Sequence, residues 1–262
     1  MKKEKKEKIF TAILSGVLAA VYLACFIFGI TEYHHQVTSA APILVMLSAV
    51  GGIVLAFLPY LTKSILKIKL SFSVNLFIQI FGLMGIGFGE TLDCYYKFPY
   101  WDDVMHFLSG IWVSYLAYAA LYAWMGEDHL SHPRAYLMAG AFTISLCSAV
   151  LWEVYEFSFD TLFGTDMQKT IPEGNLFNGG NSFADLLGSD AEVAAFFRTS
   201  KGYRYALLDT MSDMVECLGG SLLFQIILFP IVKKKPDFGK NLLILLPRHE
   251  EEPAPTVASK PL

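Results

Sequence analysis

The stretch Trp101-Asp102-Asp103-Val104-Met105-His106-Phe107-Leu108-Ser109-Gly110 opens an apolar run that continues to Met125. A helix needs about 20 predominantly apolar residues to cross the hydrocarbon core of a bilayer, and this run is long enough. Its first turns nevertheless carry two carboxylates and a histidine. The stretch therefore predicts a transmembrane helix with ionisable side chains near one end.

The composition indicates a membrane protein over the whole chain. Of the 262 residues, 54% are hydrophobic and only 17% are charged, whereas about a quarter of the residues in an ordinary soluble domain are charged. The formal net charge is −4, and the basic residues gather at the chain ends and in short loops, so no nucleic-acid-binding surface is predicted. The four cysteines lack the spacing of a disulfide framework, and we expect them to be packing residues.

Six apolar segments are long enough to span a bilayer. They are Ile9–Thr31, Ala41–Leu61, Leu70–Thr91, Val104–Met125, Arg134–Phe157 and Met211–Val232. Lysines before the first segment, after the second and after the last fall on one side, which the positive-inside rule makes cytoplasmic. We therefore expect an all-α, polytopic helix bundle of about six transmembrane helices in the cell membrane, with both termini cytoplasmic.

The chain divides into three predicted regions. A basic cytoplasmic N-terminus, 1–8, precedes a membrane domain, 9–235, and a tail, 236–262, ends the chain. The tail closes with an acidic and then Pro/Ala-rich stretch, so we expect it to be largely disordered. Within the membrane domain, residues 158–209 form a long outer loop, and a loop of this length predicts a partly ordered cap.

Acidic residues recur at helical spacing in the last three predicted spans. Side chains three, four or seven residues apart lie on one face of a helix. These residues are Asp102 and His106 in the fourth span, Glu153, Glu156 and Asp160 in the fifth, and Asp209, Asp213 and Glu216 in the sixth. Carboxylates in a low-dielectric space cannot all stay ionised unless a cation joins them or some are protonated. We therefore expect an acidic cluster with a histidine at the outer face.

This cluster predicts a divalent-metal site. The expected metal ligands are His106, Glu156, Asp213 and Asp209. Oxygen ligands suit Mg²⁺ or Mn²⁺, and a histidine also allows Zn²⁺. We expect Asp102 to orient the imidazole, and Glu153 or Glu216 to act as general base on a bound water.

Structural roles stay open for the same side chains. Aspartates before a helix often cap its free amide groups, and Asp102, Asp103 and Asp209 have that position. Glu153 and Glu156 could meet lipid headgroups, and a membrane histidine can be a hydrogen-bonded packing residue. In the long loop, Arg198, Lys201 and Arg204 would suit an anionic lipid headgroup or simply face solvent.

The order of these motifs resembles a known family. The motifs are Asp102-x3-His106 with Gly110, Trp152-Glu153, and Asp209-Thr210-x-Ser212-Asp213 with Gly219-Gly220. From about Glu90 to Gly220 they resemble the YjdF-like integral membrane family and, more loosely, the VanZ-like proteins. The VanZ-like resemblance implies a role in the cell envelope. Where the VanZ-like pattern has Glu-x-x-Gln, this chain has Glu153-x-x-Glu156, which makes its cluster more acidic.

Three classes of function fit the sequence. The first is a metal-dependent enzyme that acts on a lipid or lipid-linked phosphate, with membrane lipid as its partner. The second is a cation- or proton-coupled carrier, because transporters use intramembrane acids as relays. The third is a structural scaffold whose polar cluster holds the helices together.

Overall fold

A computed structural model describes residues 2–35, 41–92, 94–98, 100–125, 133–163, 167–168, 200–240 and 242–245. Six helices in these ranges are long and apolar enough to cross a membrane, which confirms the all-α, six-span prediction. The elements are α1 (Lys2–His35), α2 (Ala41–Leu61), the π-helix η1 (Thr62–Leu66), β1 (Ile68–Leu70), α3 (Phe72–Gly82), the π-helix η2 (Leu83–Thr91), α4 (Cys94–Lys97), α5 (Trp101–Met125), α6 (Pro133–Phe163), α9 (Ser200–Lys234), the 3₁₀ helix η4 (Pro236–Gly239) and β2 (Leu243–Leu245).

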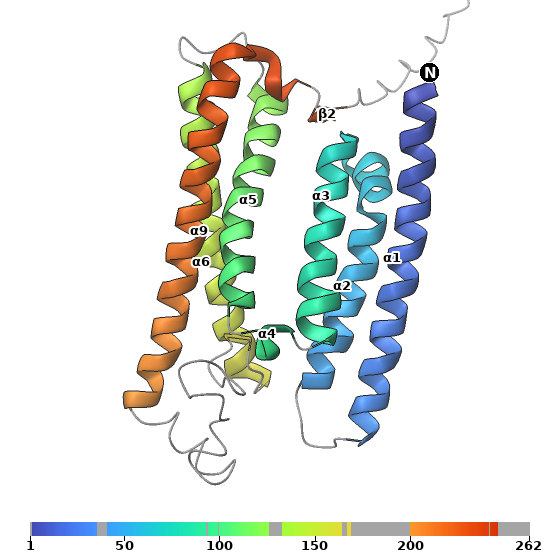
Figure 1. Ribbon diagram of the computed structural model, residues 1–262, viewed down its shortest axis with the longest axis vertical. Coiled ribbons are helices and arrows are strands. Elements are labelled where there is room, and N and C mark those ends of the chain that lie inside the picture. The colour runs from blue at the N-terminus through green and yellow to red at the C-terminus, as the bar shows by residue number, and fades with distance from the viewer. Residues whose placement is uncertain are drawn as a thin grey trace, which may run out of the picture.

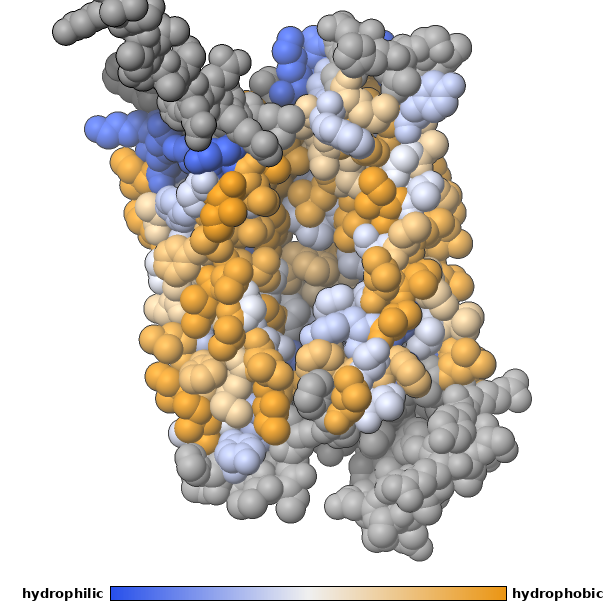
Figure 2. All heavy atoms as spheres, turned by 180° about the vertical axis from the view of Figure 1, so that it is seen from behind, coloured by the Kyte–Doolittle hydropathy of each residue, from blue (hydrophilic) through white to orange (hydrophobic). Residues whose placement is uncertain are grey.

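The long helices form two groups that stand side by side (Figure 1). The first group is α1, α2 and α3 with its continuation η2, and the second is α5, α6 and α9. Large apolar side chains such as Ile13, Leu151 and Ile226 are exposed on the outside of the bundle, and Figure 2 shows apolar residues along most of its height. Such a surface suits lipid tails, which are as apolar as these side chains.

Helices α5 and α9 approach each other through two glycines. A Cβ atom at Gly110 would overlap the Cys217 carbonyl oxygen, and one at Gly220 would overlap the Phe107 carbonyl oxygen. Small residues at helix contacts let the backbones come this close in a membrane. The contact fixes α5 and α9 in depth, with His106 one helical turn away from Gly110.

Helix α6 joins this contact through serine hydroxyls. Ser145 Oγ donates to the Gly110 carbonyl oxygen at 3.1 Å and lies 2.8 Å from Ser221 Oγ, and Ser221 Oγ donates to the same carbonyl at 3.3 Å. We call Gly110, Gly220, Ser145 and Ser221 the small-residue contact. This contact fixes the positions of α5, α6 and α9 along one another. It lies about two helical turns from Glu153 and Asp213.

The two groups of helices are joined at the end where the N-terminus lies (Figure 1). Here β1 pairs antiparallel with β2, with Ile68 opposite Leu245 and Leu70 opposite Leu243. Leu243 packs in one apolar cluster with Trp112 of α5 and Val74 of α3. This pairing was not predicted, and in the tail that we expected to be largely disordered, 236–240 and 242–245 are folded.

Some predicted helix ends were wrong. Helix α6 continues to Phe163, and α9 begins at Ser200 rather than at Met211, because the helix extends beyond its apolar portion. Part of the predicted loop 158–209 is therefore helical. Arg198 and the side chains of Lys201 and Arg204 lie outside the described residues.

Both described chain ends lie at the same end of the bundle, as an even number of spans requires (Figure 1). Hydrophilic residues gather at this end in Figure 2, and Lys69 lies 3.8 Å from Glu4 there. The acidic side chains lie toward the other end of α5. Which end faces the cytoplasm stays a prediction from the lysines.

Candidate functional site

His106 lies at the centre of a buried polar cluster. Its Nε2 atom is 3.5 Å from Asp102 Oδ1 on the same helix and 3.8 Å from Asp213 Oδ2 on α9. Its Nδ1 atom is 3.9 Å from Glu153 Oε1 on α6. One imidazole on α5 therefore faces carboxylates from both neighbouring helices.

Four buried side chains have the spacing of metal ligands. His106, Glu153, Glu156 and Asp213 each offer one ligand atom, and these atoms all lie within 4.8 Å of one another. Ligand atoms bound at about 2.0 to 2.2 Å from one ion are at most about 4.4 Å apart. Small side-chain movements would therefore bring all four onto a common ion. We call these four residues the buried ligand set.

Two further groups share Asp213 with the buried ligand set. Asp213, Asp102 and Asp209 form one group, and Asp213, Asp103 and Glu216 form the other, again with ligand atoms within 4.8 Å. Asp213 is the most buried of these acids, with 2% of its surface exposed. It is therefore the carboxylate through which the three groups connect.

Within the buried ligand set, two carboxylate oxygens make no hydrogen bond to a described residue. They are Glu153 Oε2 and Asp213 Oδ2. An ionised carboxylate buried without compensation costs several kcal/mol, so such a group requires a cation or a proton beside it. Both oxygens belong to residues of the buried ligand set, where the compensation can come from a protonated His106, whose Nε2 atom is 3.8 Å from Asp213 Oδ2, or from a bound metal ion.

Neighbouring side chains hold two of the acids in place. Trp152 Nε1 donates to Glu156 Oε1 at 2.7 Å, and Ser212 Oγ donates to Glu216 Oε1 at 3.3 Å. Partners of this kind orient ligating carboxylates. The indole of Trp152 therefore lies beside the cluster.

Asp160 has a different role from the other acids of α6. Its two carboxylate oxygens accept from the backbone N–H groups of Met167 and Gln168, at 2.6 and 3.0 Å. The Gln168 side chain in turn donates to Thr210 Oγ1 of α9 at 2.9 Å. Asp160 therefore anchors the chain after α6 and belongs to none of the three groups.

The structure brings most of the predicted ligands together, but some of the predicted site residues lie in other groups than expected. His106, Glu156 and Asp213 converge as predicted, and Glu153, expected as a base, lies among them. Asp209 instead groups with Asp102, and Glu216 groups with Asp103. These positions test proximity alone, so the metal, base and orienting roles remain predictions.

The capping alternative is wrong for Asp209. This residue lies well inside α9, which begins at Ser200, so it does not precede a helix. Asp102 and Asp103 lie in the first turn of α5, where negative charge complements the helix dipole. Glu153, Glu156 and His106 are buried rather than exposed toward headgroups.

Cys217 was missed as a neighbour of the cluster. Its Sγ atom lies 3.9 Å from His106 Nδ1 and donates to the His106 carbonyl oxygen at 3.2 Å. The sequence signal was its position four residues after Asp213, which places both on one face of α9. All four cysteines are free, so the absence of a disulfide framework is confirmed.

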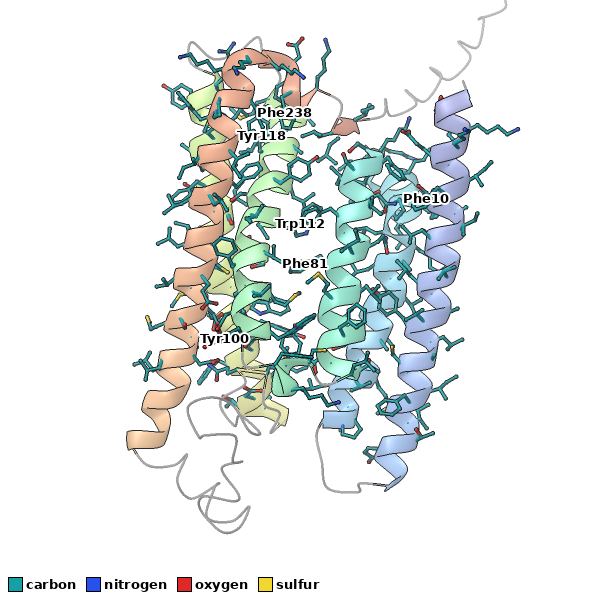
Figure 3. The ribbon with its side chains drawn as sticks, viewed as in Figure 1. Phe10, Phe81, Tyr100, Trp112, Tyr118 and Phe238 are labelled. Carbon is teal, nitrogen blue, oxygen red and sulfur yellow. The ribbon has the colours of Figure 1, made fainter. Side chains whose placement is uncertain are left out.

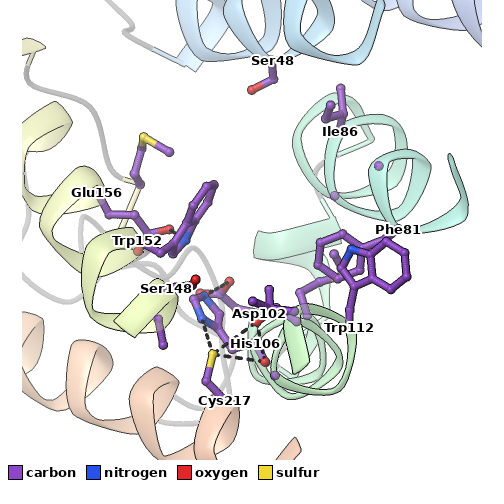
Figure 4. Close-up of a pocket in the computed structure, with 18 of the residues that line it drawn as sticks. Ser48, Phe81, Ile86, Asp102, His106, Trp112, Ser148, Trp152, Glu156 and Cys217 are labelled. Atoms are coloured by element: carbon purple, nitrogen blue, oxygen red, sulfur yellow. Dashed lines mark hydrogen bonds and ion pairs between the residues drawn. The ribbon is translucent and has the colours of Figure 1, made fainter. Parts of the chain in front are cut away.

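A cavity of about 460 Å³ adjoins the cluster (Figure 4). Its polar end includes Asp102, His106, Glu156 and Cys217. The remaining wall is mostly apolar and comes from both helix groups: Leu55, Ile78, Phe81, Ile86, Met105, Trp112, Val113 and Ala149. In Figure 3 the side chains of Phe81 and Trp112 lie between α3 and α5. The cavity thus connects the polar cluster to the apolar interior of the protein.

Comparison with known proteins places the chain in a family. Residues 13–234 match the family described as "Predicted membrane protein (DUF2238)". An uncharacterized protein of Thermotoga maritima is 27% identical over 151 residues, which are 56% of this chain and 73% of that protein. No solved structure matches the chain. Since the match spans most of its length, the chain belongs to the DUF2238 family of predicted membrane proteins.

Proposed function

We propose that this protein is a divalent-metal-dependent enzyme that acts on a lipid or lipid-linked phosphate within the membrane. One observation carries the proposal: His106, Glu153, Glu156 and Asp213 converge from three helices while two of their carboxylate oxygens lack hydrogen-bond partners among the described residues. A cation between these side chains would compensate the buried negative charge. The adjoining cavity gives a lipid room to reach it.

The residues have separate roles in this proposal. His106, Glu156 and Asp213 bind the ion, and Asp209 contributes through the group that it shares with Asp213. Asp102 orients the imidazole, and Trp152 orients Glu156, at the distances given above. A bound divalent ion would polarise a phosphoryl oxygen and acidify a water molecule.

Glu153 is the better placed of the two predicted bases. It lies within the buried ligand set, beside His106, whereas Glu216 lies outside that set; like Glu216, Glu153 has an Oε2 atom that makes no hydrogen bond to a described residue. That oxygen can take the proton of an attacking water. Glu216 lies in the group with Asp103 and receives a hydrogen bond from Ser212, so we assign it to charge balance.

The same proposal covers the side of the membrane that the cluster faces and the role implied by the resemblance to YjdF-like and VanZ-like proteins. The lysine-rich end of the bundle lies opposite the cluster, which supports an outward-facing site by the positive-inside rule. We also propose that the resemblance to YjdF-like and VanZ-like proteins reflects a shared role in the cell envelope. Arg198, Lys201 and Arg204 are then the proposed contacts of an anionic headgroup.

Two observations favour an enzyme over the scaffold and the carrier. The small-residue contact already holds α5, α6 and α9 together without any acid. The cavity wall beyond the cluster is mostly apolar and includes Ile78, Phe81 and Trp112. An ion crossing the bilayer would have few polar side chains to follow there.

The test is the metal content of the detergent-purified protein after dialysis against Mg²⁺, Mn²⁺ or Zn²⁺, measured by elemental mass spectrometry. We expect at least one equivalent in the wild type, loss of the ion in Asp213→Asn, and an unchanged content in Asp237→Asn, whose side chain is exposed on η4. Phosphate release from phosphatidic acid vesicles should follow metal content. A wild-type protein with no stoichiometric metal would overturn the proposal.

A further inference from the structure

We infer that the cavity between the two helix groups holds one hydrocarbon chain of the lipid, with the lipid's polar group at the buried ligand set. This inference rests on the proposed function, which it deepens by naming the binding site of the apolar part of the substrate. The volume of about 460 Å³ lies within the range of small-molecule sites, roughly 300 to 1,000 Å³.

The cavity runs along the helix axis, as a lipid chain does. On α5 its lining residues extend from Asp102 to Val113. At 1.5 Å per residue these positions span about 16 Å. That length reaches about half way through a hydrocarbon core of about 30 Å. A lipid whose headgroup lies at the cluster would therefore have its chain beside Trp112.

The wall changes character along this length. At one end His106 and Glu156 offer polar atoms, and Ser109 and Ser148 line the same region. At the other end the wall is aromatic and aliphatic, and Trp112 stacks on Phe77 with ring centroids 4.3 Å apart. An amphipathic molecule matches this gradient, whereas a wholly water-soluble substrate would leave the apolar end unfilled.

A lipid can reach the cavity sideways from the bilayer. Ser48 of α2 and Ser148 of α6 both line it, and Figure 4 shows the two side chains on separate sides of an open space. In Figure 2 the molecule is hollowed between its two helix groups. The entry route that we infer therefore lies between α2 and α6, at the depth of the lipid chains.

The apolar wall would give selectivity rather than affinity. A lipid chain that leaves the bilayer for the cavity exchanges one apolar surrounding for another, so its transfer free energy is small. Affinity must come mainly from the polar group at the cluster. The cavity wall decides which chains fit, because a chain that overlaps packed side chains is excluded.

The experiment uses the full chain in vesicles that contain isotope-labelled dipalmitoyl phosphatidic acid. After extraction into a mild detergent, native mass spectrometry counts the labelled lipids that each protein retains. We expect one retained lipid in the wild type and at least a five-fold reduction in Val113→Trp, which fills the cavity. The matched control is Val150→Trp, which places the same side chain on the 50%-exposed outer face of α6 and should retain the lipid.

Ala149→Phe tests the same cavity from α6, so the inference does not depend on the folding of one variant. Equal retention in the wild type, Val113→Trp and Ala149→Phe would overturn the inference. Metal content, measured on the same samples, separates the two proposals. Lipid retained by a protein without metal supports the chain site and removes the metal enzyme, whereas metal without a retained lipid does the reverse.

Discussion

Replacing Gly220 with alanine tests how closely α5 and α9 must approach. The new Cβ atom would overlap the Phe107 carbonyl oxygen and lie 3.0 Å from its carbon and 3.1 Å from Ile111 N. These are backbone atoms, so they cannot move aside as a flexible side chain would. The two helices would have to separate, which also strains the bonds from Ser221 and Ser145 to the Gly110 carbonyl oxygen.

The size of the effect follows from opposing contributions. Alanine is favoured over glycine inside a helix by about 0.8 to 1.0 kcal/mol. Overpacking costs about 1 to 3 kcal/mol, and each weakened hydrogen bond costs about 1 kcal/mol. We therefore expect Gly220→Ala to destabilise the protein by about 2 to 4 kcal/mol. Gly16→Ala is the matched control, because no atom lies within 4 Å of its added Cβ and only the helix preference remains.

Thermal unfolding can be followed through the buried thiols. Cys25, Cys94 and Cys217 are buried and react with a fluorogenic maleimide only when the protein opens, while the exposed Cys147 is replaced by serine to remove the early signal. We expect a Tm for Gly220→Ala that is several degrees below that of Gly16→Ala. Equal Tm values for the two variants would refute the close packing of α5 on α9.

Three other perturbations examine the cluster and its surroundings. Saturation with the bound metal at about 100 times Kd should stabilise the wild type by about 2.7 kcal/mol, and chelation or Asp213→Asn should remove this gain in a melting experiment. Trp152→Phe removes the donor to Glu156 and should weaken metal affinity by about 10- to 100-fold in a calorimetric titration, with little change in helix content. Leu243→Ala should lower the free energy of unfolding by about 2 to 4 kcal/mol because this side chain is buried, whereas Ile244→Ala should lower it much less because that side chain is exposed. Equal losses in the two variants would contradict the packing of β2.

The six spans were predictable because length and apolarity decide them. A bilayer accepts only helices or closed barrels, so a long apolar run such as Arg134–Phe157 has one structural outcome. The ends were less predictable, since nothing in hydropathy requires a helix to stop where it leaves the apolar layer. Helix α9 illustrates this, as its first eleven residues lie before the predicted span.

The cluster was predictable in outline because helical periodicity gives each carboxylate its face. The spacing of Glu153 and Glu156, and of Asp213 and Glu216, placed the acids of each pair on one face of a helix. The predicted ends of the spans put these acids at a similar depth in the membrane. Which acid meets which depends on the rotation of each helix. That rotation is set by the small-residue contact, whose glycines and serines gave no signal of pairing in a single sequence.

The contact between β1 and β2 could not be predicted for a different reason. Each strand has only three residues: Ile68-Lys69-Leu70 alternates apolar and polar side chains but is too short to predict a strand, and Leu243-Ile244-Leu245 is apolar throughout. Their pairing depends on the two helix groups bringing distant segments together. The cavity is likewise a product of assembly, since its wall comes from both groups.

The β1–β2 pairing also imposes an order on assembly. Leu70 leaves the ribosome long before its partner Leu243, and at about 5 to 20 residues per second the delay is roughly 10 to 35 s. During that interval α1, α2 and α3 can pack with one another, while the face that later lines the cavity remains in contact with lipid. The second group of helices then closes over a surface that has been in contact with lipid, so the lipid chain that we infer for the cavity would be enclosed while the protein is being made.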